Sequence, residues 1–188
     1  RLEASERISA EGKVVIPLKR VEVETAGEQL VDAGVEAIVV SFLNSYMNSS
    51  HEQEAKKILK TRWPHLHVVG SAEVLPLFRE FERTSTAVVN AYVQPVVSLY
   101  LSKLQERLQN TGYRKDILIM QSNGGMMSVE AAQDFSVKTI LSGPAGGVIA
   151  ATQIAAESGF KNLIAYDMGG TSLDVSLVVG GEPMVSNG

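Results

Sequence analysis

The stretch "IAYDMGGTSLDVSLVVGG", residues 164–181, predicts how the C-terminal part of the chain folds. Two apolar runs flank a short segment that holds two glycines and two hydroxyl residues, with an acid on either side. Because so short a connection leaves no room for a crossover, the two runs are expected to pair as antiparallel strands. A second glycine pair and the run "EPMV", residues 182–185, predict a third antiparallel strand.

The centre of this hairpin, "DMGGTSLD" (residues 167–174), has two interpretations. Glycines let backbone N–H groups approach phosphate oxygens, and an acid at a strand end, here Asp167, can hold Mg²⁺ through water. The candidate phosphate contacts are Gly169, Gly170, Thr171 and Ser172. The alternative is a tight hairpin with Gly-Gly at its corner. A mere turn needs neither the hydroxyls nor a second acid, Asp174, but the residue types leave both interpretations open.

Working outward from the hairpin, strands and helices alternate along the rest of the chain. Helices are predicted over residues 21–34, 48–63, 81–110, 129–135 and 148–159, and strands over 35–43, 66–71, 116–122, 137–141, 162–167 and 173–179. Gly34 is placed to end the first helix, and Ser50 with Gln53 has the spacing of a capping box for the second. This alternation predicts an α/β fold with mostly parallel strands before the final antiparallel ones.

The helix over residues 81–110 carries a four-residue apolar repeat, which predicts a buried stripe. The repeat consists of Tyr92, Val96, Tyr100, Leu104 and Leu108. Pro95 is expected to kink this helix or to start a second one. The charged residues before the repeat, Arg79, Glu80, Glu82 and Arg83, are expected to form a solvated helix start.

Two further glycine-rich loops are candidate binding elements. "SGPAGG", residues 142–147, lies where a strand leads into a helix, with Ser142 as a possible cap and Pro144 in the first turn. A helix N-terminus can receive an anion, which makes Gly143, Gly146 and Gly147 candidate cofactor contacts, while close helix packing is the alternative. "QSNGGMMS", residues 121–128, follows a strand. Its Asn123, Gly124 and Gly125 are candidate substrate contacts, although Asn-Gly is also a common turn dipeptide.

Composition narrows the functional classes. A net charge of −4 gives no reason to expect nucleic acid or an anionic membrane as a partner, and the chain has no cysteine for disulfides or thiolate chemistry. His65 and His67 lack an obvious third metal ligand nearby. P-loop, dinucleotide-binding, zinc-protease and serine-hydrolase motifs do not occur. We expect a cytoplasmic protein, and we expect the chain, which begins at Arg1, to be a segment of a longer polypeptide.

The chain resembles the hydantoinase A / 5-oxoprolinase family in several stretches that occur in the same order. They are "ERISAEGKVVIPL", "VEAIVVSFLNSYMNSSHE", "FERTSTAVVNAYVQP", "LIMQSNGGMMS", "LSGPAGGV" and "IAYDMGGTSLDVSLV". The resemblance covers essentially all 188 residues. It implies that residues 1–82 are the C-terminal part of the family's N-terminal region, and that residues 83–188 are the start of its hydantoinase A region.

The resemblance also implies a fold similar to actin, sugar kinases and chaperone ATPases: a ribonuclease H-like mixed sheet with flanking helices, incomplete in this segment. In such proteins two hairpins grip the ATP phosphates, and "DMGGTSLD" matches the second. Gly169, Gly170 and Thr171 would then contact phosphate, and Asp167 would organise Mg²⁺ and water, with Asp174 as a further catalytic candidate. "SGPAGG" matches the crossing between lobes, with the lobe change near residues 158–160. Leu173 stands where the family usually has threonine, so side-chain contacts there are in doubt.

The implied activity is ATP-dependent opening of a cyclic amide, a hydantoin or 5-oxoproline, by phosphorylation of its carbonyl oxygen. The first phosphate hairpin is absent, so we expect the segment alone to be inactive and to need a second subunit or domain of the hydantoinase B type. Two alternatives remain: an ATP-dependent ketone carboxylase subunit, and an actin- or chaperone-like ATPase binding module.

Overall fold

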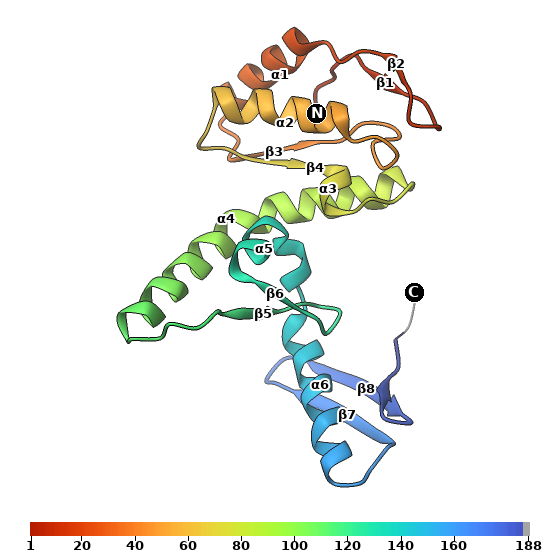
Figure 1. The fold of residues 1–188 in the computed structure, drawn as a ribbon, viewed down its shortest axis with the longest axis vertical. Helices are drawn as coiled ribbons and strands as arrows, with labels where there is room; N and C mark the ends of the chain where they lie inside the picture. Colours follow the sequence, from red (N-terminus) through yellow and green to blue (C-terminus); the bar gives the residue numbers. More distant parts are fainter. Residues whose placement is uncertain (186–188) are drawn as a thin grey trace. The chain divides into compact units, whose positions relative to one another are not determined.

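The computed structural model describes residues 1–185, which form two compact units (Figure 1). The first unit comprises Arg1–Lys103, and the second begins at Leu104. Within residues 1–185, none of the helices is long and apolar enough to span a membrane. Each unit is described separately below.

The first unit is built around a parallel strand pair. Its elements are β1 (Arg7–Ile8), β2 (Val14–Ile16), α1 (Arg20–Asp32), β3 (Ala37–Val40), α2 (Ser50–Arg62), β4 (His67–Gly70), α3 (Ser71–Val74) and most of α4 (Glu80–Asn110). β1 and β2 form an antiparallel hairpin, whereas β3 and β4 are parallel, with Ala37 opposite His67. Helices α1 and α2 lie together on one side of the β3–β4 pair (Figure 1).

The core of the first unit lies between α1, α2 and the two strands. Its buried members are Leu18, Val23, Ile38, Val40, Ala55, Leu59, Leu66 and Val68. A Cβ on Gly27 would lie 2.5 Å from Trp63 Cζ3 and 2.6 Å from Leu59 Cδ2, so this glycine permits the close approach of α1 to α2. The predicted helix end is also confirmed, because Gly34 has a left-handed φ of +79° just after α1.

The start of α2 differs from its prediction by one residue. Ser49, not Ser50, occupies the N-cap position, and Gln53 Nε2 donates to Ser49 Oγ at 2.8 Å. The N–H of Ser50 donates instead to Asn48 Oδ1 at 3.0 Å. The polar residues predicted to begin the helix therefore do so, but the proposed Ser50–Gln53 capping box is wrong.

Helix α4 continues as one helix of 31 residues through Pro95. The predicted start of a second helix at Pro95 is therefore wrong, and the alternative, a kink, stays a prediction. The predicted burial is also wrong for Tyr92, Val96 and Tyr100, which are exposed, although Leu101 beside them is buried. A four-residue repeat identifies an apolar face, but burial requires a neighbouring element to cover it.

Besides the end of α4, the second unit contains two antiparallel sheets and three helical segments. They are β5 (Leu118–Met120), β6 (Met126–Ser128), α5 (Val129–Asp134), the 3₁₀ helix η1 (Ser136–Thr139), α6 (Ser142–Glu157), β7 (Leu163–Met168), β8 (Leu173–Val179) and β9 (Glu182–Pro183). β7, β8 and β9 form an antiparallel sheet in that order, as predicted. In residues 1–185 only β3 and β4 are parallel, so the expectation of mostly parallel strands is wrong and the chain has a mixed helix-and-sheet fold.

Two local predictions in the second unit are wrong. Residues 137–141 do not form a strand, because most of them belong to η1, where the Ile140 N–H donates to the Val137 carbonyl at 3.2 Å. Ser142 is not a cap but the first residue of α6; Leu141 precedes it with a left-handed φ of 59°. A serine does cap α5, where Ser128 Oγ accepts from the N–H of Ala131 at 3.2 Å.

Candidate functional site

A groove of about 450 Å³ runs between α6 and the β7–β8 hairpin of the second unit. Its lining comprises Pro144, Gly147, Val148 and Ala151 of α6, Leu163, Ile164, Ala165, Tyr166 and Asp167 of β7, and Asp174 and Ser176 of β8. Three residues singled out from the sequence, Gly147, Asp167 and Asp174, thus lie on one groove although they come from different elements.

The two aspartates of the groove are cross-strand neighbours. Asp167 pairs with Asp174 in the β7–β8 register, next to the Met168–Leu173 pair that ends the ladder. Like charges directly opposite each other in a sheet are destabilising, and a cation held between them would relieve this repulsion. In residues 1–185 no cluster of three or more potential metal ligands is present. A metal here would therefore take most of its ligands from water or from a bound phosphate.

The turn after Asp167 is closed by one backbone bond, from the Gly169 N–H to the Ser172 carbonyl at 3.0 Å. Neither Gly169 nor Gly170 adopts a positive φ. A Cβ on Gly170 would meet no atom within 4 Å, and one on Gly169 would meet only the Ser172 carbonyl oxygen at 4.0 Å. Neither backbone conformation nor packing within residues 1–185 therefore calls for these glycines, whereas close approach by a ligand would.

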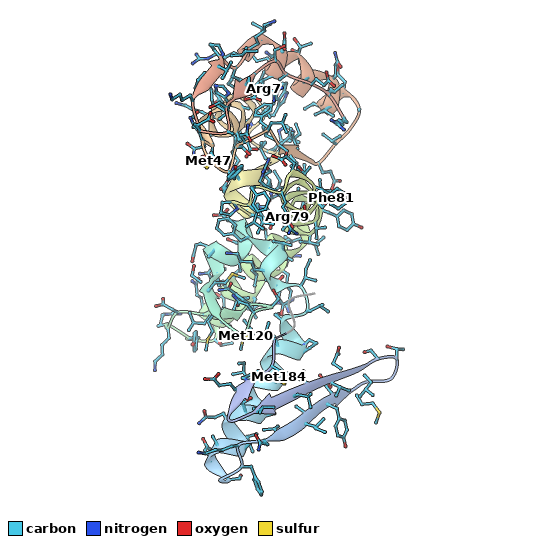
Figure 2. The ribbon with its side chains drawn as sticks, turned by 90° about the vertical axis from the view of Figure 1, so that its right-hand side faces the viewer. Arg7, Met47, Arg79, Phe81, Met120 and Met184 are labelled. Carbon is cyan, nitrogen blue, oxygen red and sulfur yellow. The ribbon has the colours of Figure 1, made fainter. Side chains whose placement is uncertain are left out.

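The three glycines of α6 have different surroundings. A Cβ on Gly146 would lie 3.7 Å from Met120 Cγ of β5, a residue labelled in Figure 2, so this position matches the close-packing alternative. Cβ atoms on Gly143 and Gly147 would meet no atom within 4 Å, and Gly147 also lines the groove. Only one of the three candidate cofactor contacts in α6 therefore faces the aspartates.

The Asn123 loop has the geometry of a hairpin turn. The Gly124 N–H donates to the Gln121 carbonyl at 3.0 Å, and the Gln121 N–H donates to the Gly125 carbonyl at 2.8 Å. Gly124 has a φ of +84°, and Asn123 Oδ1 accepts from the Gly125 N–H at 2.9 Å. This is a type I turn followed by a glycine bulge, which accounts for the sequence of the loop. The loop does not line the groove, and its role in substrate binding stays a prediction.

The sequence analysis did not identify Arg83 as a buried residue. Its side chain is fully buried, and it was expected instead to belong to a solvated helix start. Its Nη1 donates to the Leu77 carbonyl at 2.7 Å, its Nη2 to the Phe42 carbonyl at 2.8 Å, and its Nε to Ser71 Oγ at 3.0 Å. Ala87, Asn90 and Ala91, which are four, seven and eight residues further along α4, are also buried. That helical spacing was the signal in the sequence that could have placed Arg83 on the inner face.

A buried carboxylate completes this network. Glu52 Oε1 accepts from the Phe42 N–H at 2.9 Å and from the Ser71 hydroxyl at 2.7 Å, and Oε2 accepts from the Ala72 N–H at 2.9 Å. The Ser71 hydroxyl therefore joins the two buried charges, donating to Glu52 and accepting from Arg83. Since Phe42 follows β3 and Ser71 follows β4, the network ties together the carboxyl ends of the parallel strands.

Comparison with known proteins identifies the family of the chain. The model of the hydantoinase/oxoprolinase family matches residues 83–188, and that of the hydantoinase/oxoprolinase N-terminal region matches residues 1–63. The chain therefore belongs to the hydantoinase/oxoprolinase family.

Two similar enzymes illustrate the relation, one of them by both its sequence and its structure. The chain is 36% identical to the caprolactamase subunit alpha of Pseudomonas jessenii over 93% of its own length and 25% of that protein. The crystal structure of the ATP-dependent caprolactamase from Pseudomonas jessenii superposes with a TM-score of 0.82 at 35% identity, over 93% of this chain and 25% of that one. A nucleotide-free structure of acetone carboxylase, from work on ATP-dependent acetone carboxylation, gives a TM-score of 0.86 at 34% identity, over 95% and 26%. The chain thus spans about a quarter of the length of these proteins.

Proposed function

We propose that residues 1–188 belong to an enzyme that uses ATP to open a cyclic amide by phosphorylating its carbonyl oxygen. The observation that carries the proposal is the groove in which Asp167, Asp174 and Gly147 meet, beside the open glycines of the 169–172 turn. The family membership and the ATP-dependent caprolactamase support it. Hydantoins and 5-oxoproline are the favoured substrates, since both are cyclic amides and the family is named for enzymes that act on them.

The residues around the groove fit a nucleotide phosphate. Space for a ligand is open beside Gly169 and Gly170, where an added Cβ would meet no atom closer than 4.0 Å. The Gly169 N–H already donates to the Ser172 carbonyl, so the proposed donors to phosphate are the Gly170 N–H and the hydroxyls of Thr171 and Ser172. Bound ATP supplies the phosphoryl group that turns an amide oxygen into a leaving group. The protein's contribution to such a transfer is positioning and neutralisation of charge.

The two carboxylates fit a magnesium ion that accompanies the phosphates. In this proposal Asp167 holds Mg²⁺ through water and Asp174 takes part from the opposite strand, which removes the repulsion between them. Of the α6 residues, Gly147 leaves room for a ligand on the groove, and Gly143 leaves open space at the start of the helix.

The proposal extends to the architecture of the whole enzyme. An actin-like fold, with a lobe change near residues 158–160, would place the β7–β8 hairpin in the second lobe and a first phosphate hairpin, from outside residues 1–188, in the other. On this basis residues 1–82 and 83–188 are parts of two family regions, and the segment alone is inactive. A cytoplasmic enzyme with a second subunit of the hydantoinase B type is consistent with a relative named subunit alpha.

A second candidate function is ketone carboxylation, favoured by the likeness to acetone carboxylase. Both reactions use ATP to activate a carbonyl oxygen, and the groove residues would serve either. The two are separated by measuring whether ATP turnover by the full-length enzyme requires bicarbonate.

The test is ATP hydrolysis by the full-length enzyme with 5-oxoproline, hydantoins, caprolactam, and ketones with bicarbonate. Asp167→Asn is expected to lower turnover about 100-fold or more, equivalent to roughly 3 kcal/mol of transition-state stabilisation. The matched control is Asp116→Asn, whose exposed side chain lies outside the groove and should leave turnover unchanged. Near-normal turnover in Asp167→Asn would remove this residue from the mechanism.

A further inference from the structure

Two hydroxyls form a pair at the carboxyl end of β3. Ser41 follows Val40, the last residue of that strand, and its Oγ lies 2.6 Å from Oγ1 of Thr84 on α4. One hydroxyl of the pair donates to the other, so one hydroxyl hydrogen is left over, and within residues 1–185 it has no protein acceptor. Open α/β sheets place their ligands at the carboxyl ends of the strands. The pair therefore offers a hydrogen-bond donor where such a sheet binds a ligand.

The buried network of Arg83 and Glu52 holds both members of this pair. Arg83 Nη2 donates to the Phe42 carbonyl at 2.8 Å, and the Phe42 N–H donates to Glu52 Oε1 at 2.9 Å. Ser41 directly precedes Phe42, and Thr84 directly follows Arg83. Because their backbone is already fixed, the two hydroxyls lose little freedom when a ligand binds, which favours affinity.

A hydrogen-bond acceptor lies beside the hydroxyl pair. Glu80 precedes Thr84 by four residues on α4, so the two side chains are neighbours on the surface of the helix. The Glu80 side chain is 44% exposed, and its Oε1 lies 4.0 Å from Arg83 Nη2, which is beyond hydrogen-bond distance. Glu80, Thr84 and Ser41 line the same groove of the first unit. A neutral donor and an anionic acceptor thus face one space.

This donor and acceptor together match the amide group of a lactam. A small ring holds its planar amide in the cis form, so the N–H and the C=O lie side by side. The carbonyl oxygen needs a donor, which the hydroxyl pair supplies, and the N–H needs an acceptor, which Glu80 supplies. Phe42 and Phe81 line the groove as well and offer apolar surface to the ring methylenes; Phe81 projects from the beginning of α4 (Figure 2). A ketone has no N–H and would leave Glu80 without a partner.

We propose that Ser41, Thr84 and Glu80 bind the amide group of the substrate. The hydroxyl pair donates to the carbonyl oxygen, and the Glu80 carboxylate accepts from the ring N–H. The proposal rests on the proposed function, because it takes a cyclic amide as the substrate. It adds the residues that select a lactam with a free N–H over an N-alkylated lactam or a ketone.

Calorimetric titration of the full-length enzyme, without ATP, tests the contact with Glu80. The ligands are 5-oxoproline and caprolactam, each compared with its N-methyl derivative, which keeps the carbonyl and lacks the N–H. The wild type is expected to bind the N–H forms at least about 10-fold more tightly, since hydrogen bonds to charged groups are the stronger ones, and Glu80→Ala should lose most of this preference. The matched control is Glu82→Ala, which should keep the preference. The Glu82 side chain is 46% exposed on the same helix, pairs with Arg79 and does not line the groove.

The double variant Ser41→Ala/Thr84→Val tests the contact with the carbonyl oxygen. It should weaken the binding of the N–H and N-methyl forms by the same factor, about 3- to 10-fold, because both forms keep the carbonyl. Thr84→Ser retains a hydroxyl and should bind both forms as the wild type does.

The preference for the N–H form separates this site from a purely structural role. Equal weakening of both forms by Glu80→Ala, or wild-type affinity in the double variant, overturns the proposal. If a lactam stimulates ATP turnover and the preference survives in Glu80→Ala, the site fails and the proposed function stands. If no cyclic amide binds or stimulates turnover, both fail.

Discussion

Replacing Arg83 with methionine removes a buried positive charge whose hydrogen bonds join several segments of the first unit. The guanidinium is fully buried and donates to three groups, the carbonyls of Phe42 and Leu77 and the hydroxyl of Ser71. Methionine fills much of the volume but donates to none of them, and the hydroxyl of Ser71 then no longer links a positive charge to the buried carboxylate of Glu52. Removing one of two buried charges that a shared hydroxyl links is expected to cost about 3–5 kcal/mol, so Arg83→Met should lower the free energy of unfolding by that amount.

The assay is urea denaturation, followed by circular dichroism, of the variant and of a matched control. Arg79 lies one helical turn before Arg83, with a side chain that is 63% exposed and an ion pair to Glu82 at 3.3 Å. Because exposed ion pairs contribute little, Arg79→Met should change the free energy of unfolding by less than about 0.5 kcal/mol. The two arginines thus differ in burial and not in chemistry, which separates the network from a general effect of removing charge.

A double-mutant cycle with Glu52→Gln tests whether the two charges act together. Glutamine can present only one acceptor oxygen, so it cannot accept from Phe42, Ser71 and Ala72 as Glu52 does. Since the Ser71 hydroxyl joins both charges, the double variant should lose less than the sum of the single losses, by about 1–3 kcal/mol. Additive effects, or a loss below about 1 kcal/mol for Arg83→Met alone, would refute the network.

Four other substitutions have outcomes set by the structure. The pKa of Glu22 falls from its ordinary 4.5 to about 2, mainly because its carboxylate accepts a hydrogen bond from the Ser5 N–H. The stabilisation that this ionised carboxylate contributes is therefore complete above about pH 4.5 and is lost as the pH falls toward 2. Denaturation at each pH should show this loss in the wild type and not in Glu22→Gln. In Gly124→Ala the new side chain would have to adopt a positive φ, and its Cβ would lie 3.2 Å from Ile149 Cδ1 of α6. In Gly112→Ala the φ is also positive, but no atom lies within 4 Å of the new Cβ. The first should therefore lower the melting temperature more than the second, which costs about 1–2 kcal/mol. Gly170→Ala should leave the melting temperature unchanged and raise the KM for ATP in the full-length enzyme; an unchanged KM would count against phosphate binding at this turn.

The β7–β8 hairpin and the end of α1 were predictable because short-range geometry determines them. A four-residue connection cannot accommodate a crossover, so β7 and β8 had to be antiparallel. Gly34 ends α1 for an equally local reason, since the residue after a helix often adopts a left-handed conformation. The same local reasoning failed at residues 137–141, because strand propensity depends on a partner strand. Here Ser136 Oγ donates to the Ala132 carbonyl at 2.9 Å, which joins the segment to α5 instead.

Burial along α4 could not be derived from its sequence. Charge suggested that Arg83 was exposed, yet six hydrogen bonds to Arg83 and Glu52 compensate their desolvation, and five of the six span ten or more residues of sequence. Conversely, apolar periodicity suggested that Tyr92 and Val96 were buried, and they are exposed. In both cases the missing information is which element packs against the helix, a long-range property that a periodic pattern does not contain.

The glycines show what the structure adds to the sequence at the candidate site. The sequence left the candidate glycines of residues 124–125, 143–147 and 169–170 open between a turn or close packing and a ligand contact. The structure explains one group by packing or backbone conformation, namely Gly27, Gly34, Gly124 and Gly146. Four candidates have neither explanation within residues 1–185: Gly143, Gly147, Gly169 and Gly170. Gly147 lines the same groove as Asp167 and Asp174, and Gly169 follows Asp167 by two residues. A site for a phosphate and its metal requires glycines that leave room for a ligand, next to carboxylates such as this opposed pair. This coincidence favours phosphate binding over a plain turn at residues 167–174.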